Sequence, residues 1–343
     1  MTNWELRIDD VPAPVPDAGQ VLTRVLACGI CGSDLHMLRH GAELRALMAD
    51  ADADALDDPM RPQTFEPEHD CVMGHEFCCE VVELGPGVTN LRVGDRVVSI
   101  PGAFDATGVH AVGYSNRYPG GYGELMVLNA DLAIVVTDDV TSRVAALTEP
   151  MAVGTHAVNK SGIAVGDAAI VLGLGPVGLA CVAELKRRGI GPVVGADFSS
   201  TRRALAVHFG CDEVVDPTSE SAIAAWRRVD GRRPLVVFEA VGVPGMIDQA
   251  MRIAPRDSRI LVVGVCMLQD RIIPMVGIGR ELSIQFVLGY TPEEFAATHQ
   301  VITSGAWDLE PLITGSVGID GVPKAFDDLA DPDRHAKILV EPA

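Results

Sequence analysis

The chain of 343 residues is 48% hydrophobic and 22% charged, a composition typical of a soluble globular protein with room for two domains. Its 27 Lys and Arg residues against 47 Asp and Glu residues give a net charge of −20, which disfavours nucleic acid and anionic membranes as partners. No apolar run approaches the ~20 residues of a membrane span, and the N-terminus has no signal-peptide pattern. We therefore expect a cytoplasmic protein.

The chain up to about residue 150 has a pattern rich in β-strand. Strands are predicted over residues 5–9, 20–26, 77–84, 93–98 and 122–129. Residues 38–73 indicate a long connection with helical spacing over 41–56, and residues 101–121 indicate a loop rich in Gly, Pro and aromatic side chains. Several short strands with little helix favour a small barrel-like domain.

From residue 168 onward, strand and helix patterns alternate. Strands are predicted over residues 168–172, 192–197, 213–215, 235–238 and 259–264. Alternation of this kind is typical of a doubly wound parallel sheet. The expected fold is therefore α/β, with a β-barrel domain followed by a parallel sheet.

A glycine-rich turn follows the first strand of that sheet and opens a helix. Gly173, Gly175 and Gly178 have the spacing of a dinucleotide-binding turn, with Pro176 and Val177 between the last two. The three glycines permit a tight turn, close approach of a pyrophosphate, and close packing of helix on strand. The sequence thus predicts a dinucleotide site; the alternative is a turn with a structural role alone.

An acidic residue ends the next predicted strand. Asp197 follows Gly178 by 19 residues, where a carboxylate accepts hydrogen bonds from adenosine ribose hydroxyls and repels a 2′-phosphate. We therefore expect NAD as the cofactor. Arg202 and Arg203 lie close enough in the sequence to keep NADP as an alternative.

Two distant stretches carry the ligand types that zinc favours. Cys31, within residues 28–36, offers a thiolate, and His75 offers an imidazole. Glu149 offers a carboxylate to complete such a site. The structural alternatives are a buried thiol, a core histidine, and a redox pair formed by Cys28 and Cys31.

These stretches resemble the zinc-containing medium-chain alcohol dehydrogenase family. The resemblance is carried by residues 28–36, 74–76, 93–97, 149–153 and 173–178, and it extends through 289–291 and 335–340. Glu149 followed by Pro150 is similar to the polyol and threonine dehydrogenase branch. The resemblance implies a GroES-like domain over residues 1–150, a Rossmann domain over 151–290, and a return to the first domain over 291–343.

The resemblance also implies the metal ligands. Cys31 and His75 would bind a catalytic zinc. Glu149 is the preferred third ligand, and Glu76 is the alternative. Because residues 98–120 contain no cysteine, we expect one zinc per subunit and no structural zinc.

Further roles follow from the same resemblance. Asp34 would orient His75 through its far ring nitrogen. Ser33 and His36 would pass the alcohol proton towards solvent. The segment expected beside the nicotinamide consists of Val263, Gly264 and Val265.

The function implied is hydride transfer between NAD and a secondary alcohol, polyol or sugar-like substrate, by a homo-oligomer (dimer or tetramer). Cys31 and His75 lie 44 positions apart, a long spacing, so the segment between them is a candidate for shaping the pocket mouth or a subunit contact. Two alternatives remain at this point: a metal-free quinone or enoyl reductase, and a non-catalytic dinucleotide-binding protein.

Overall fold

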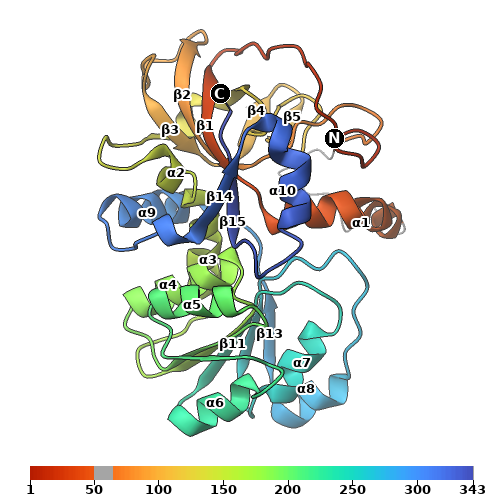
Figure 1. Ribbon diagram of the computed structural model, residues 1–343, viewed down its shortest axis with the longest axis vertical. Coiled ribbons are helices and arrows are strands. Elements are labelled where there is room, and N and C mark those ends of the chain that lie inside the picture. The colour runs from red at the N-terminus through yellow and green to blue at the C-terminus, as the bar shows by residue number, and fades with distance from the viewer. Residues whose placement is uncertain (50–64, 343) are drawn as a thin grey trace.

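The computed structural model describes residues 1–49 and 65–342 and has two lobes (Figure 1). One lobe is built on a mostly antiparallel sheet that includes strands from both ends of the chain. The other is a parallel sheet with helices packed on it. The expected combination of a β domain with a doubly wound parallel sheet is confirmed.

A seven-stranded sheet forms the first lobe, in the order β14-β15-β1-β2-β3-β7, with β6 also paired to β1. Its strands are β1 (Gln20–Gly29), β2 (Glu76–Leu84), β3 (Arg96–Ser99), β6 (Leu125–Asn129), β7 (Ala133–Val135), β14 (Ile313–Val317) and β15 (Lys337–Val340). Strand β1 organises the lobe because it pairs with β2, β6 and β15. Its Val21 and Val25 are at most 1% exposed and form part of the lobe's apolar core.

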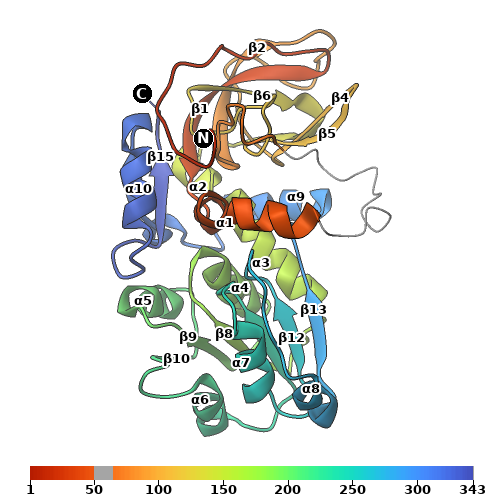
Figure 2. The same ribbon diagram turned by 90° about the vertical axis from the view of Figure 1, so that its right-hand side faces the viewer.

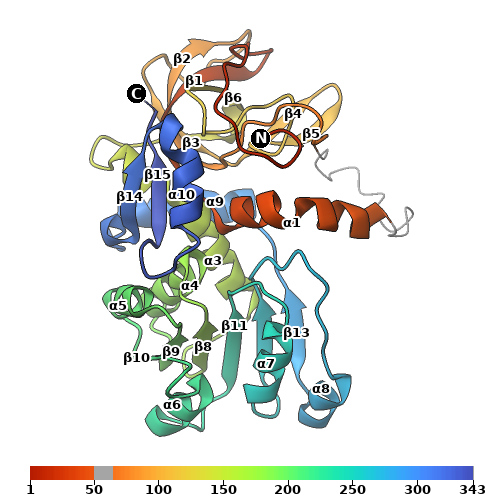
Figure 3. The same cartoon turned by 45° about the vertical axis from the view of Figure 1, so that its right-hand side comes forward.

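The two lobes meet around three helices, α1 (Gly32–Ala49), α3 (Thr148–Lys160) and α9 (Pro292–Thr303), as Figure 3 shows. Helix α1 begins directly after β1, so the end of this central strand fixes where the helix starts. The C-terminal strand β15 runs antiparallel to the same end of β1, with Cys28 opposite Val340. Segments from both ends of the chain therefore converge at the junction. The small helices α2 (Ser142–Ala145) and α10 (Val322–Asp328) belong to the first lobe.

The second lobe is a six-stranded sheet in the order β10-β9-β8-β11-β12-β13, and all its neighbouring strands are parallel. Its strands are β8 (Ala168–Leu172), β9 (Val193–Ala196), β10 (Glu213–Val215), β11 (Leu235–Glu239), β12 (Arg259–Val262) and β13 (Ser283–Phe286). Its helices are α4 (Pro176–Arg187), α5 (Ser200–His208), α6 (Ala222–Val229), α7 (Met246–Ile253) and α8 (Pro274–Arg280) (Figure 2). Every residue of β8, β9 and β11 is buried, as expected for central parallel strands covered on both faces. The chain order reverses at β8, so the crevice at the carboxyl end of β8 is where such a sheet binds ligands.

Four predictions about elements need correction. Residues 5–9 form no strand; only an isolated bridge joins Thr2 and Glu5. Residues 101–121 contain a hairpin, β4 (Gly102–Asp105) and β5 (Gly108–Ala111), where a loop was expected. The helix expected over 41–56 begins earlier, at Gly32, and its expected end lies outside the described residues. Strands β7, β13, β14 and β15 have no counterpart among the predicted strands.

Within the described ranges, no helix combines the length and apolar character needed to span a membrane.

Candidate active site

The start of α1 gathers several of the residues singled out in the sequence. Cys31 immediately precedes the helix, and Ser33, Asp34 and His36 lie in its first turns. Asp34 Oδ2 accepts the backbone N–H of Cys31 at 3.1 Å. A carboxylate in the first turn is favourable for a helix, because it satisfies a free N–H and faces the positive end of the helix dipole.

Three metal-binding side chains come together at this point. Ligand atoms of Cys31, His75 and Glu76 all lie within 4.8 Å of one another. Cys31 is half-buried, whereas His75 and Glu76 are buried. Sulfur, imidazole nitrogen and carboxylate oxygen are the donors of catalytic zinc sites, which keep a further position open for substrate. The donor set therefore fits zinc.

Glu76 is paired with a buried lysine. Lys337 Nζ lies 2.8 Å from Glu76 Oε1 and 2.6 Å from Oε2, and it also donates to Ile30 O at 3.0 Å. Lys337 and Glu76 are 1% and 0% exposed. Gly29 leaves room for this carboxylate, because a Cβ at that position would lie 2.0 Å from Glu76 Oε2.

His75 faces a buried carboxylate. Its Nδ1 lies 3.4 Å from Asp34 Oδ1, which leaves Nε2 for a metal. Burial by itself raises the pKa of Asp34, but His75 and hydrogen bonds from tyrosines lower it below its usual value. Burial by itself lowers the pKa of His75, whereas Asp34 and Cys31 raise it well above its usual value. Asp34 therefore lies beside His75, as expected from the sequence, but the expected hydrogen bond is not formed, because among the described residues His75 Nδ1 has no hydrogen-bond partner.

Two tyrosines complete the surroundings of Asp34. Tyr114 donates to Asp34 Oδ1 at 2.6 Å, and Tyr122 donates to Oδ2 at 2.5 Å. The Tyr114 hydroxyl also lies 3.1 Å from Ser33 Oγ. Neither tyrosine was anticipated, and no local sequence signal marks them. Lys337 did have a signal, because it is a charged residue heading the otherwise apolar strand Lys337–Val340.

Glu149 lies at the N-terminal end of α3 and is 9% exposed. Burial raises its pKa to about 7, and nearby His75 opposes that rise. Its carboxylate interacts electrostatically with Glu76 and Tyr290. Glu149 is thus near the metal group but is not a member of the closely spaced set of three.

His36 lies one helical turn from Ser33 on α1 and is half-buried. Burial lowers its pKa, and His40 and Arg39 add to the effect. The rings of His36 and His40 are 6.3 Å apart.

The glycine turn after β8 has the form of a phosphate cradle. A Cβ on Gly178 would lie 2.0 Å from Gly173 O, so the helix packs closely on the turn. At Gly175, the N-cap of α4, no side chain caps the helix, and the nearest atom to an added Cβ is Arg202 Nη1 at 3.8 Å. The helix N–H groups and this arginine are therefore available to a pyrophosphate. Pro176 occupies the first turn of α4, where its missing N–H costs nothing.

Asp197 ends the neighbouring strand β9, with Arg202 close by. Its carboxylate accepts Leu174 N at 2.8 Å and Ser199 N at 2.8 Å, and Arg202 Nη1 is 3.9 Å away. These bonds fix Asp197 beside the glycine turn, and each oxygen keeps a lone pair for a ribose hydroxyl. Arg203 instead donates to the backbone oxygens of Asp197 and Phe198.

Val263, Gly264 and Val265 follow β12 at the same edge of the sheet. A Cβ on Gly264 would lie 2.3 Å from Gly242 N, so the loops after β11 and β12 touch here. Val263 is buried, whereas Val265 is 39% exposed and available to a cofactor.

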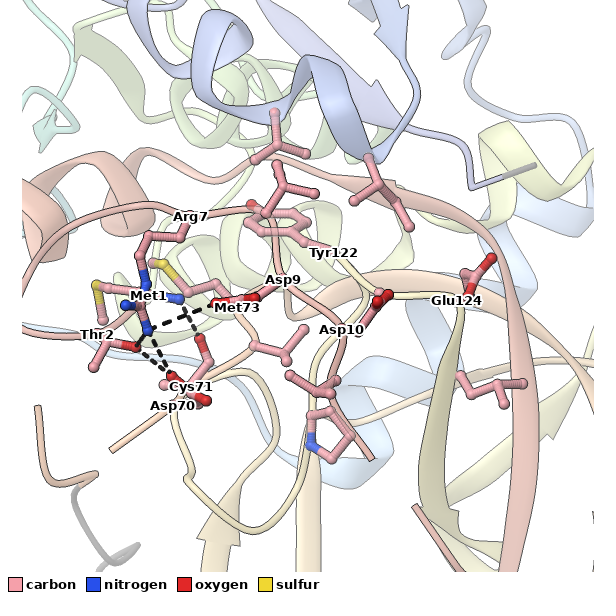
Figure 4. Close-up of a pocket in the computed structure, with 18 of the residues that line it drawn as sticks. Met1, Thr2, Arg7, Asp9, Asp10, Asp70, Cys71, Met73, Tyr122 and Glu124 are labelled. Atoms are coloured by element: carbon pink, nitrogen blue, oxygen red, sulfur yellow. Dashed lines mark hydrogen bonds and ion pairs between the residues drawn. The ribbon is translucent and has the colours of Figure 1, made fainter. Parts of the chain in front are cut away.

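A separate cavity lies between the N-terminal segment and the first lobe (Figure 4). Its lining includes Tyr122, and within it the terminal amine of Met1 donates to Cys71 O at 2.8 Å while Arg7 pairs with Asp70 at 3.2 Å. Among the described residues, none of the metal-binding group lines it. The cavity therefore adjoins the site through Tyr122, which also contacts Asp34.

Comparisons with known proteins agree with this geometry. The family described as "Alcohol dehydrogenase GroES-like domain" matches residues 17–138, and "Zinc-binding dehydrogenase" matches residues 176–304. The chain is 30% identical to (R,R)-butanediol dehydrogenase of Bacillus subtilis (strain 168) over 350 residues, covering 98% of this chain and 97% of that protein. It is 28% identical to sorbitol dehydrogenase of Bos taurus, covering 94% of this chain and 89% of that protein.

A crystal structure of 2R,3R-butanediol dehydrogenase from Bacillus subtilis superposes with a TM-score of 0.82 at 28% identity, over 100% of this chain and 98% of that one. The superposition spans both lobes of this chain, so the similarity is not confined to the dinucleotide-binding half. The chain therefore belongs to the zinc-containing medium-chain alcohol dehydrogenase family, in its polyol dehydrogenase branch, and is a zinc-dependent alcohol oxidoreductase.

Proposed function

We propose that this enzyme oxidises small secondary alcohols and polyols to ketones, with Cys31, His75 and Glu76 as the zinc ligands. The observation that carries the proposal is the close approach of these three donors directly beside Ser33 at the start of α1. The relatives named for butanediol and sorbitol support a substrate with a secondary hydroxyl. The metal-free reductase alternative is not favoured, since it gives no role to the grouping of Cys31 and His75.

The choice of third ligand rests on distance. Glu76 belongs to the set within 4.8 Å, and Glu149 does not. We assign Glu149, the ligand preferred from the sequence, to the polar wall beside the metal. Zinc analysis of Glu76→Gln and Glu149→Gln tests this: loss of zinc only in Glu149→Gln would reverse the assignment.

Zinc held by Cys31, His75 and Glu76 would supply a Lewis acid for the alcohol oxygen, and NAD⁺ would supply the hydride acceptor. The residues of the chain position these groups and move the proton. Asp34 holds His75 from behind, and Lys337 fixes the Glu76 carboxylate. Ser33 Oγ accepts the proton of the substrate hydroxyl as it releases its own proton, and His36, one turn along α1, exchanges a proton with solvent.

We propose that NAD binds with its pyrophosphate at the N-terminus of α4, its adenosine ribose at Asp197, and its nicotinamide beside Val263, Gly264 and Val265. Arg202, near Gly175, would pair with a phosphate. Because Asp197 repels a 2′-phosphate, NAD is the preferred cofactor over NADP.

We further propose one zinc per subunit and a cytoplasmic homo-oligomer. The sequence over residues 98–120 has no cysteine for a second, structural site. The edge strand β13 and the preceding helix α8 carry exposed apolar side chains suited to contact with a second copy.

Turnover of wild-type protein with NAD⁺ and a panel of secondary alcohols, polyols and primary alcohols tests the substrate class, with Cys31→Ala as the matched variant. We expect secondary alcohols or polyols to be oxidised, one zinc per subunit, and loss of both zinc and activity in Cys31→Ala. Folded wild-type protein that binds NAD but holds no zinc would refute the proposal.

A further inference from the structure

The hydroxyl of Tyr114 lies between two polar side chains of α1. It is 2.6 Å from Asp34 Oδ1 and 3.1 Å from Ser33 Oγ. The Tyr114 ring lies against His75, with ring centroids 5.3 Å apart and planes inclined by 36°. Tyr114 therefore joins the carboxylate behind the metal group to the hydroxyl that faces the substrate.

The direction of each hydrogen bond follows from counting protons. Asp34 already receives Cys31 N–H at 3.1 Å and Tyr122 O–H at 2.5 Å on Oδ2, so its carboxylate acts only as an acceptor. A phenol carries one proton, and Tyr114 donates it to Asp34. In the contact with Ser33, the Tyr114 oxygen is consequently the acceptor and Ser33 is the donor.

We propose that Tyr114 is a positioning residue that orients the Ser33 hydroxyl so that the site binds the alcohol form of the substrate in preference to the carbonyl form. While the substrate binds, before any proton is transferred, the Ser33 proton is directed at Tyr114, so Ser33 presents only lone pairs, and these accept a hydrogen bond from an alcohol O–H. A carbonyl has no such proton. To donate to a carbonyl, Ser33 must turn away from Tyr114 and give up that hydrogen bond.

The expected effect is a change in the dissociation constants of the alcohol and carbonyl forms. The overall equilibrium between alcohol and carbonyl is fixed by the reaction, so a variant cannot change the ratio of catalytic efficiencies in the two directions. It can change how tightly each form binds. Loss of one neutral hydrogen bond corresponds to roughly a three- to tenfold change in relative affinity.

The test uses two unreactive analogues on intact, zinc-loaded protein, and it rests on the proposed function. Dissociation constants are measured for trifluoroethanol with NAD⁺ and for isobutyramide, an amide carbonyl that is not reduced, with NADH. We expect Tyr114→Phe to weaken trifluoroethanol relative to isobutyramide by roughly three- to tenfold. Tyr122→Phe is the matched control, because the Tyr122 hydroxyl contacts Asp34 and Gly29 O but not Ser33. This variant should keep the wild-type ratio of the two dissociation constants.

Zinc content is measured for each variant, so that a change in metal binding is separated from a change in selectivity. Ser33→Ala removes the same hydrogen bond from its other end. Ser33→Ala should lower the affinity for trifluoroethanol relative to that for isobutyramide. Adding Tyr114→Phe to Ser33→Ala should have no further effect on this relative affinity. Ser33→Ala also serves as the test if Tyr114→Phe does not fold.

An unchanged ratio in Tyr114→Phe, or an equal shift in Tyr122→Phe, overturns the inference while leaving the proposed function intact. Wild-type protein that binds neither analogue in the presence of cofactor overturns the proposed function and the inference with it.

Discussion

Lys337 carries an ammonium group into a part of the molecule where it is 1% exposed, and among the described residues it donates hydrogen bonds to the Glu76 carboxylate and to one backbone carbonyl. Burial by itself lowers the pKa of Lys337, but Glu76 and Cys31 raise it above its usual value. The pair therefore remains charged. A buried pair of this kind contributes little when intact, but removing one partner leaves the other charge unpaired and is costly.

Replacing Lys337 by Met should lower the free energy of unfolding of the metal-free protein by about 3–5 kcal/mol, because Glu76 is then buried without a partner. Chemical denaturation in the presence of a chelator measures this. Zinc should restore part of the loss, since Glu76 then has a cation to bind. Lys324→Met is the control: Lys324 is 72% exposed, and its change should cost less than about 0.5 kcal/mol. Equal effects of the two substitutions would contradict the argument.

Glu149 should make the stability of the metal-free protein depend on pH. Burial raises its folded-state pKa to about 7, from an ordinary value of 4.5. Between these values the folded state holds a proton that the unfolded state has released, so stability falls as pH rises through this window. The loss is on the order of a few kcal/mol.

Glu149→Gln should remove that loss, which denaturant titrations between about pH 4.5 and 7 would detect. Glu124→Gln, at an exposed position, is the control. If Glu149→Gln keeps the wild-type slope of stability against pH, Glu149 is not the group responsible.

At the scale of elements, the hairpin β4–β5 depends on one carboxylate. Asp105, at the end of β4, is paired with Arg117 Nε at 2.9 Å and accepts hydrogen bonds from Tyr118 at 3.0 Å and from the Thr107 backbone N–H at 2.7 Å. His110 of β5 also contacts it at 3.2 Å. Burial by itself raises the pKa of Asp105, but the hydrogen bonds from Thr107, Tyr118 and His110 lower it far below its usual value. The hairpin is thus bound to the segment between Tyr114 and Tyr122.

Asp105→Asn should loosen this hairpin, because the charge-assisted hydrogen bond from Arg117 is lost. In addition, the side-chain NH₂ group of the asparagine would face hydrogen-bond donors and find no acceptor. We expect a cost of about 1.5–3 kcal/mol and faster amide hydrogen exchange over residues 102–118. Asp138→Asn, whose side chain is fully exposed, is the control. Hydrogen exchange in Asp105→Asn that matches wild type would contradict this role.

At the scale of the whole molecule, β13 is one of the two edge strands of the parallel sheet in the part of the chain that the structure describes, the other being β10. Phe286 and Leu288 are 70% and 85% exposed, and Met275 and Ile278 of α8 are each 68% exposed. In Figure 1, α8 and β13 lie along the same side of the second lobe. An edge strand next to an apolar surface is a site for pairing with another chain.

Replacing Phe286 and Leu288 by Lys should convert the proposed oligomer to smaller species without unfolding it, because the two charges would be buried at the contact. Sedimentation velocity measures the change, and circular dichroism checks the fold. Val15→Lys is the control, since Val15 is 80% exposed but lies on the N-terminal segment. Unchanged sedimentation of the double variant would place the interface elsewhere.

Local patterns were sufficient for much of the fold and for the motif residues. Alternating strands and helices predicted the parallel sheet, and Gly173, Gly175 and Gly178 predicted the turn after β8, because both depend on neighbours in the sequence. The hairpin at 101–121 was missed because its short strands lie in a segment rich in Gly and Pro. Strand β13 was missed because its mostly exposed residues lack the buried pattern of the other parallel strands.

The sequence by itself determined which chemistry is present, since Cys31, His75 and the glycine turn are recognisable from their neighbours alone. It left the third donor open and favoured Glu149 over Glu76. Only the tertiary structure decided which groups surround that chemistry. Tyr114 reaches Asp34 across 80 residues of sequence, and Lys337 reaches Glu76 across 261. Contacts over such separations exist because β1 pairs at once with β2, β6 and β15, so closure of the first lobe, and not local propensity, brings them to one place.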